Sequence, residues 1–163
     1  MGRERVLALC RMQCGRKEVC ISQVRGKLDR IVKRGEISAA EAGSILSSLI
    51  ADKFIDEERF AAAYVRDKFR LSGWGRRKIV YNLVQLGIPA DRIEKALQEN
   101  YSSREDGSGG GGVLEKLVQR KWKSLKKEEP DSVKRGKVLR FAMGRGFDYP
   151  DILEALNNIG KTE

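Results

Sequence analysis

The chain of 163 residues contains no histidine. Histidine is the side chain that most often acts as a general base near neutral pH, and it is a common zinc ligand. Its absence excludes Ser-His and Cys-His catalytic pairs and every zinc site that depends on imidazole. This absence removes most hydrolase mechanisms, and no catalytic residue, metal site or cofactor is expected from the sequence.

Cysteine is scarce as well, with only three in the chain. An odd number of cysteines, without a cationic apolar leader at the N-terminus, predicts a reducing cytoplasm rather than a disulfide framework. Cys10 and Cys14 are one helical turn apart and Cys20 follows closely, so a thiolate metal site or a redox pair is one interpretation. Small thiols that fill an apolar helix face are the favoured one.

The sequence also lacks any run of about 18 apolar residues, so we expect no membrane-spanning segment. It has positive charge in excess, since 33 Lys and Arg against 23 Asp and Glu give a net charge of +10. This balance is typical of proteins whose partners are acidic, such as a nucleic-acid backbone or a nucleoprotein.

Apolar residues recur at helical spacing almost throughout, and no segment alternates as a strand would, so about nine helices are predicted. Ser38 followed by Glu41 predicts a capping box. The acidic run Asp56-Glu57-Glu58 could suggest a metal or catalytic site, but a helix cap at Asp56 is the favoured interpretation. Four glycines are expected to end helices in the left-handed conformation. They are Gly15, Gly35, Gly87 and Gly146.

The chain repeats itself at an offset of 59 residues, which pairs Gly87-Ile88 with Gly146-Phe147. A looser copy precedes these two, so we predict an all-α fold of three three-helix modules. Because such modules bury little apolar surface alone, an elongated tandem array is expected. No Lys-Ser/Thr follows the glycine-rich stretch, so a flexible linker is favoured there over a phosphate-binding loop. The predicted parts are 1–51, 52–101 and 113–163 for the modules and 102–112 for the linker.

Two groups of cations, one in the middle module and one in the third, are candidates for a contact surface. In the middle module they flank Ser72-Gly73-Trp74-Gly75, where free amides at a helix N-terminus would also attract phosphate or carboxylate. For any single cation a solvated helix face is the simpler explanation, and for Trp74 packing is favoured over base stacking. The candidates are Lys68, Arg70, Trp74, Arg76, Arg77, Lys78, Lys134, Arg135, Lys137, Arg140 and Arg145.

Three stretches together resemble the RecX family of recombination regulators. They are FIDEERFAAAYVRDKF at 54–69, GWGRRKI at 73–79 and Arg145-Gly146-Phe147. The resemblance implies an all-helical protein without enzymatic activity that binds the RecA recombinase filament on single-stranded DNA. It further implies that the array lies in the filament groove and inhibits filament extension, ATP hydrolysis and strand exchange. A cytoplasmic monomer that regulates recombination and the SOS response is the expected protein.

A different class of function is a helical module that binds DNA directly. No predicted helix carries the grouping of Arg, Asn and Gln that reads base edges, so such binding would be independent of sequence and steeply salt-dependent. Weak non-specific DNA binding is also compatible with the first interpretation. A redox or metal sensor built on the three cysteines ranks last.

Overall fold

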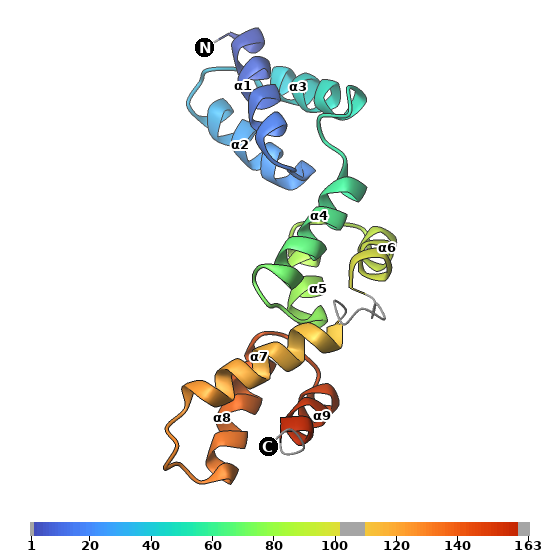
Figure 1. The fold of residues 1–163 in the computed structure, drawn as a ribbon. Coiled ribbons are helices and arrows are strands. Elements are labelled where there is room, and N and C mark those ends of the chain that lie inside the picture. The colour runs from blue at the N-terminus through green and yellow to red at the C-terminus, as the bar shows by residue number, and fades with distance from the viewer. Residues whose placement is uncertain (1, 102–109, 160–163) are drawn as a thin grey trace. The chain divides into compact units, whose positions relative to one another are not determined.

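The computed structural model describes residues 2–101 and 110–159, and within these ranges the chain forms nine α-helices and no strand (Figure 1). The prediction of an all-α fold with helices in tandem is confirmed. No helix in the described ranges is long and apolar enough to cross a membrane. The helices are α1 (Arg3–Arg16), α2 (Ile21–Lys33), α3 (Ala39–Ala51), α4 (Glu57–Arg70), α5 (Arg76–Gln85), α6 (Ala90–Asn100), α7 (Gly110–Ser124), α8 (Asp131–Gly144) and α9 (Tyr149–Ile159).

The chain divides into two compact units. Unit 1 comprises Met1–Ala63 and Leu83–Ile93, and unit 2 comprises Tyr64–Asn82 and Glu94–Glu163. The helices α4, α5 and α6 contribute residues to both units. Each unit is therefore built from a terminal group of three helices and a share of the middle three.

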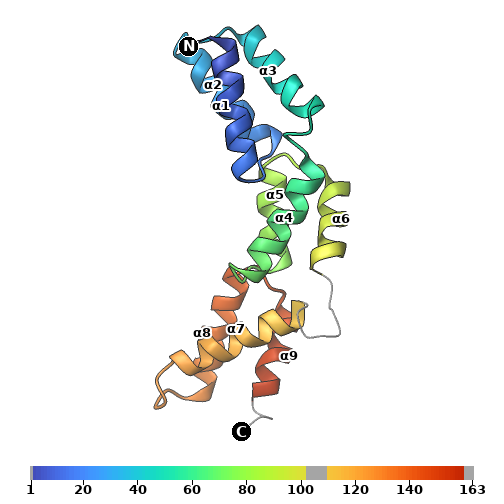
Figure 2. The same ribbon diagram turned by 45° about the horizontal axis from the view of Figure 1, so that its top comes forward.

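In unit 1, the helices α1, α2 and α3 surround one apolar core, and both earlier helices contact α3 (Figures 1 and 2). Their apolar residues recur every three or four positions, so each helix turns one stripe inward. The buried residues of this core are Val6, Leu7, Cys10, Val19, Val24, Leu28, Ile31, Ile37, Ala42, Ile45, Leu49 and Ile55.

In unit 2, the helices α7, α8 and α9 form a second core in which each helix contacts the other two. Trp122 and Leu125 near the end of α7 are partly buried against it. The buried residues of this core are Leu114, Val118, Val138, Ala142, Phe147, Ile152, Ala155 and Leu156.

Cys10 and Cys14 pack against the apolar core, whereas Cys20 immediately precedes α2 with its Sγ 3.2 Å from the Ser22 hydroxyl. Cys10 and Cys20 are buried and Cys14 is half-buried, and all three are free thiols. Burial raises the pKa of the Cys10 and Cys14 thiols, which favours the thiol over the thiolate form. No group of three potential metal ligands occurs among the described residues. The favoured interpretation of small buried thiols agrees with this packing.

Most of the predicted helix ends are confirmed. Gly35, Gly87 and Gly146 follow helices with φ of 71°, 76° and 92°, where glycine avoids the strain that other residues meet. The prediction for Gly15 is wrong, because that residue lies inside α1. The helix α7 begins at Gly110, so the last three residues of the predicted linker belong to it, and 102–109 lie outside the described residues.

Both predicted helix caps are present. The Ser38 side chain accepts a hydrogen bond from the Glu41 N–H at 3.1 Å, and the Glu41 carboxylate accepts one from the Ser38 N–H at 2.7 Å. The Asp56 carboxylate accepts a hydrogen bond from the Arg59 N–H at 3.0 Å. These bonds satisfy amides that a helix start leaves free. The acidic run at Asp56 therefore begins α4.

Replacing Asp56 with alanine is expected to destabilise the protein by about 1 kcal/mol at neutral pH. The Arg59 N–H and the Arg59 charge hold the pKa of the Asp56 carboxyl below its ordinary value of 3.8. Because this pKa is lower in the folded state, the stabilisation is complete above the unfolded pKa and is lost as the pH falls through the folded one. Urea denaturation followed by circular dichroism at neutral and acidic pH measures the difference.

Asp56→Asn is the matched control for this cap. Its side chain keeps an acceptor for the Arg59 N–H without a carboxylate to titrate, so most of the stability should remain and its pH dependence should disappear. An alanine variant as stable as the wild type at neutral pH would contradict the assigned cap.

Candidate partner-binding surface

Two lysines lie over the ring of Trp74 in unit 2. Lys68 comes from the last turn of α4 and Lys78 from the first turns of α5. Their Nζ atoms are 4.6 and 4.4 Å from the centroid of the Trp74 ring, within cation–π distance. The break between the two helices thus brings cations and the indole together, as the sequence predicts. The half-buried Trp74 packs against its own chain's cations.

The amides at the start of α5 are not free, contrary to the expectation that they attract an anion. The N–H of Gly75 donates to the carbonyl of Arg145 at 2.7 Å, and the N–H of Arg77 donates to the carbonyl of Gly146 at 3.1 Å. The N–H of Arg76 donates to the hydroxyl of Tyr101 at 3.1 Å. The turn between α8 and α9 therefore fills the position that the sequence assigned to phosphate or carboxylate.

This contact requires two glycines. A Cβ added to Gly75 would lie 2.4 Å from the carbonyl carbon and oxygen of Gly146, and one added to Gly146 would lie 2.5 Å from the Cβ of Lys78. Arg145 reinforces the contact, because its Nη1 donates to the carbonyl of Ser72 at 2.8 Å. Two groups of candidates from different modules, around Trp74 and at Arg145, thus meet at one backbone junction.

A related junction occurs in unit 1. The hydroxyl of Ser22, in the first turn of α2, donates to the carbonyl of Leu86 at 2.7 Å. The repeat places Leu86-Gly87 at the positions of Arg145-Gly146. In unit 1 the start of α2 donates to the turn after α5, and in unit 2 the start of α5 donates to the turn after α8. Each is the second helix of its module. The internal repeat is therefore also a repeat of the contact between neighbouring modules.

Three candidates on α8 have partners within unit 2. Lys134 is buried with 9% of its surface exposed, and its Nζ lies 5.2 Å from the centroid of the Trp122 ring. Lys137 forms an ion pair with Glu129 at 2.6 Å, and this bond lowers the pKa of the Glu129 carboxyl. Arg135 donates to the side chain of Asn157 at 2.8 Å. These contacts give the three side chains roles within the fold.

The remaining arginines are more accessible. Arg76 pairs with Glu94 at 2.8 Å, and Arg77 lies 3.9 Å from Asp148 with 70% of its side chain exposed. Exposed pairs of this kind contribute little stability. Two further candidates are exposed and form no ion pair or side-chain hydrogen bond in the part of the chain that the structure describes. These are Arg70, which ends α4, and Arg140 on α8.

Two residues of this region, Tyr64 and Tyr101, were not among the candidates from sequence, whereas the cation Lys121 on α7 is part of the third module's basic group. The ring centroid of Tyr64 lies 5.5 Å from the Nζ of Lys68, at the helical i, i+4 spacing that could have indicated the pair. Lys121 lies 5.0 Å from the ring centroid of Phe141. Tyr101, whose burial raises the pKa of its hydroxyl, caps α5 from a position 25 residues away, and nothing in the local sequence indicates that contact.

Replacing Lys134 with glutamate is expected to lower the stability of unit 2 by about 2 kcal/mol, because it removes the cation from the Trp122 ring and places a buried carboxylate near Glu129. Replacing the exposed Arg140 with glutamate should change stability by less than about 0.5 kcal/mol. Urea denaturation followed by tryptophan fluorescence measures both, since the chain's two tryptophans, Trp74 and Trp122, lie in unit 2. Equal midpoints for the two variants would show that Lys134 has no structural role.

The second and third modules match two models of one protein family. Residues 56–97 match the model described as RecX, second three-helix domain, and residues 113–156 match RecX, third three-helix domain. Together the two matches cover more than half of the chain. They include both candidate groups and the junction between them.

Individual proteins and solved structures agree with these matches. The chain is 34% identical over 116 residues to "Regulatory protein RecX" of Clostridium tetani, covering 71% of this chain and 50% of that protein. It is 28% identical over 140 residues to the protein of the same name from Chlorobium limicola, covering 86% of this chain and 80% of that protein. Several of the curated relatives are about twice as long as the segment that matches them.

The fold matches a crystal structure of RecX from Lactobacillus salivarius with a TM-score of 0.76 at 18% identity, over 97% of this chain and 96% of that one. A second crystal structure, described as regulatory protein RecX, gives a TM-score of 0.78 at 19% identity and covers 95% of this chain and 73% of that one. Similarity of sequence, domain order and fold thus converge on one assignment, and the chain belongs to the RecX family.

Proposed function

We propose that this protein regulates the RecA recombinase by binding the RecA filament on single-stranded DNA, and that it does so without enzymatic activity. The observation that carries the proposal is membership of a family of regulatory proteins, established over the second and third three-helix domains. Binding in the filament groove would obstruct filament extension, ATP hydrolysis and strand exchange. The protein would act as a monomer in the cytoplasm, where such a filament forms.

Electrostatics supports an acidic partner of this kind. The net charge of +10 favours approach to a filament that carries DNA phosphates, and the attraction should weaken as salt rises. Arg70 and Arg140 supply guanidinium groups that no side chain of the described protein neutralises. We assign the first contacts to these two residues and to the exposed face of the cluster around Trp74.

The division into modules 1–51, 52–101 and 113–163 belongs to the same proposal. The junctions at Ser22 and Gly75 link the start of a module's second helix to the following module. Each of these links lies within one of the two units.

The ATP hydrolysis rate of the cognate RecA on single-stranded DNA, titrated with this protein, tests the proposal. We expect inhibition at substoichiometric ratios, with no effect from a basic protein of matched charge. Absence of inhibition at saturating protein in low salt would contradict the proposal. In that case equal salt-dependent binding to unrelated DNA sequences, without RecA, would identify a direct DNA-binding protein.

A further inference from the structure

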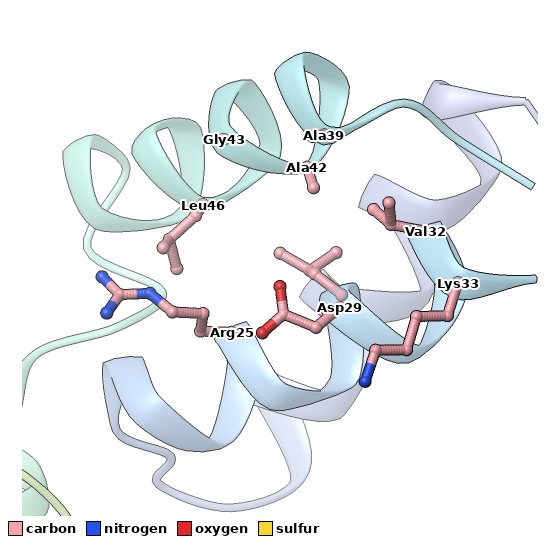
Figure 3. Close-up of a pocket in the computed structure, with 9 residues that line it drawn as sticks. Arg25, Asp29, Val32, Lys33, Ala39, Ala42, Gly43 and Leu46 are labelled. Carbon is pink, nitrogen blue, oxygen red and sulfur yellow. The ribbon is translucent and has the colours of Figure 1, made fainter. Parts of the chain in front are cut away.

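A groove of about 400 Å³ lies between α2 and α3 in unit 1, outside the candidate surface described above (Figure 3). Its floor is apolar and includes Leu28, Val32 and Leu46. The side of the groove formed by α3 carries the small residues Ala39 and Gly43. Two neighbouring helices thus leave an apolar strip open along their length.

Three charged side chains of α2 border this groove. Arg25 and Lys33 stand at its two ends, and Asp29 lies between them (Figure 3). All three are exposed, and none forms an ion pair or a side-chain hydrogen bond with another described residue. Because the two cations are eight residues apart, they are separated by about 12 Å along the helix axis. The groove therefore offers two cations without an ion pair at its ends and one carboxylate between them, around an apolar centre.

The fold does not require a glycine at position 43, on the α3 side of the groove. Glycine is disfavoured in a helix interior relative to alanine. A Cβ added at Gly43 would have no atom within 4 Å, so neither close packing nor backbone conformation demands glycine there. Its missing side chain leaves the α3 side of the groove open.

We propose that this groove binds an amphipathic helix of an acidic partner protein. Apolar side chains of the helix would enter the strip between Val32 and Leu46, as in other recognition of a helix by a groove. Carboxylates about two turns apart would pair with Arg25 and Lys33. Asp29 would disfavour a carboxylate at the centre of the helix, which restricts the acidic residues to the ends.

The probe for this proposal is a fluorescein-labelled helical peptide of about 16 residues, with leucines along one face and a glutamate at each end of that face, eight residues apart. Fluorescence anisotropy with the full chain measures its binding. A peptide with lysines in place of the two glutamates is the control for charge, and one with serines in place of the leucines is the control for apolar contact. The acidic peptide should bind at least about tenfold more tightly than either control.

Variants of the chain locate the binding site. Gly43→Leu should fill the groove and weaken binding of the acidic peptide by at least about tenfold, whereas Gly43→Ala should have a smaller effect. The double variant Arg25→Glu/Lys33→Glu should reverse the preference between the acidic and basic peptides. Arg5→Glu/Lys17→Glu, which reverses two exposed cations outside the groove and changes the net charge by the same amount, is the control. Circular dichroism should show unchanged helix content for every variant.

Three results would overturn the proposal. They are binding that Gly43→Leu leaves unchanged, equal affinity for the acidic and basic peptides, and no binding of the acidic peptide at concentrations up to about 1 mM. None of the groove residues belongs to the surface assigned to RecA. Failure of this test would therefore leave the proposed regulation of RecA intact. Failure of the RecA test would likewise leave the groove proposal intact.

Discussion

Gly146→Ala is expected to destabilise unit 2 by about 3 kcal/mol, more than most single substitutions do. Two costs combine at this position. The φ of 92° is unfavourable for a residue with a Cβ, and the new methyl group would lie 2.5 Å from the Cβ of Lys78 and 2.6 Å from its amide nitrogen. Relief of this overlap would separate the turn between α8 and α9 from the start of α5. Urea denaturation followed by tryptophan fluorescence reports on this unit.

Gly87→Ala is the matched control, because the repeat places Gly87 at the position of Gly146. Because Gly87 lies in unit 1, which contains neither tryptophan, its urea denaturation is followed by circular dichroism. Its φ of 76° imposes a similar backbone cost, but no atom lies within 4 Å of the added Cβ, so a loss of only about 1 kcal/mol is expected. Gly75→Ala tests the same contact from the other side without a positive φ. If the Gly146 and Gly87 variants lost equal stability, the close approach at the junction would not be stabilising.

Reversing the two unpaired arginines, as Arg70→Glu/Arg140→Glu, is expected to raise the concentration for half-inhibition of RecA ATP hydrolysis at least about tenfold in low salt. The two side chains are exposed and make no contact that the fold needs, so the double variant should unfold at the wild-type urea concentration. The effect should shrink as salt rises, because screening weakens the attraction that the reversal removes. This expectation rests on the proposed function.

The control is Arg5→Glu/Lys17→Glu, which changes the net charge by the same amount at exposed positions in unit 1. Equal loss of inhibition in both double variants would show that net charge alone carries the effect. A double variant of Arg70 and Arg140 that inhibits as well as the wild type would remove these residues from the contact surface.

Local sequence determined the helices and most of their ends. Ser38 with Glu41, Asp56, and the glycines at 35, 87 and 146 act within one or two helical turns, so their neighbours along the chain are sufficient to predict them. The predicted helix end at Gly15 is wrong for a related reason. A glycine inside an exposed helix cannot be distinguished from a glycine at a helix end when only its neighbours in sequence are considered. The internal repeat could also be recognised from sequence, because matching residues recur at a constant offset along the chain.

The sequence alone also determined the family, through motifs that survive in linear order, and it located the cations and the indole around Trp74. The structure decided which of those cations are available. Lys134, Lys137 and Arg140 are all cations on α8, and the sequence does not distinguish them. In the structure Lys134 lies against Trp122 and Lys137 pairs with Glu129, whereas Arg140 is exposed. A helical pattern specifies the face of a side chain, but its partner depends on which other helix packs there.

Tertiary structure alone decided the state of the α5 N-terminus and the groove in unit 1. Free amides at a helix start attract an anion only if nothing else accepts their hydrogen bonds, and here carbonyls about 70 residues away do so. The groove arises because small residues of α3 face α2 across a space that the core does not fill. Both features depend on contacts between segments distant in sequence, which local propensity and periodicity do not encode.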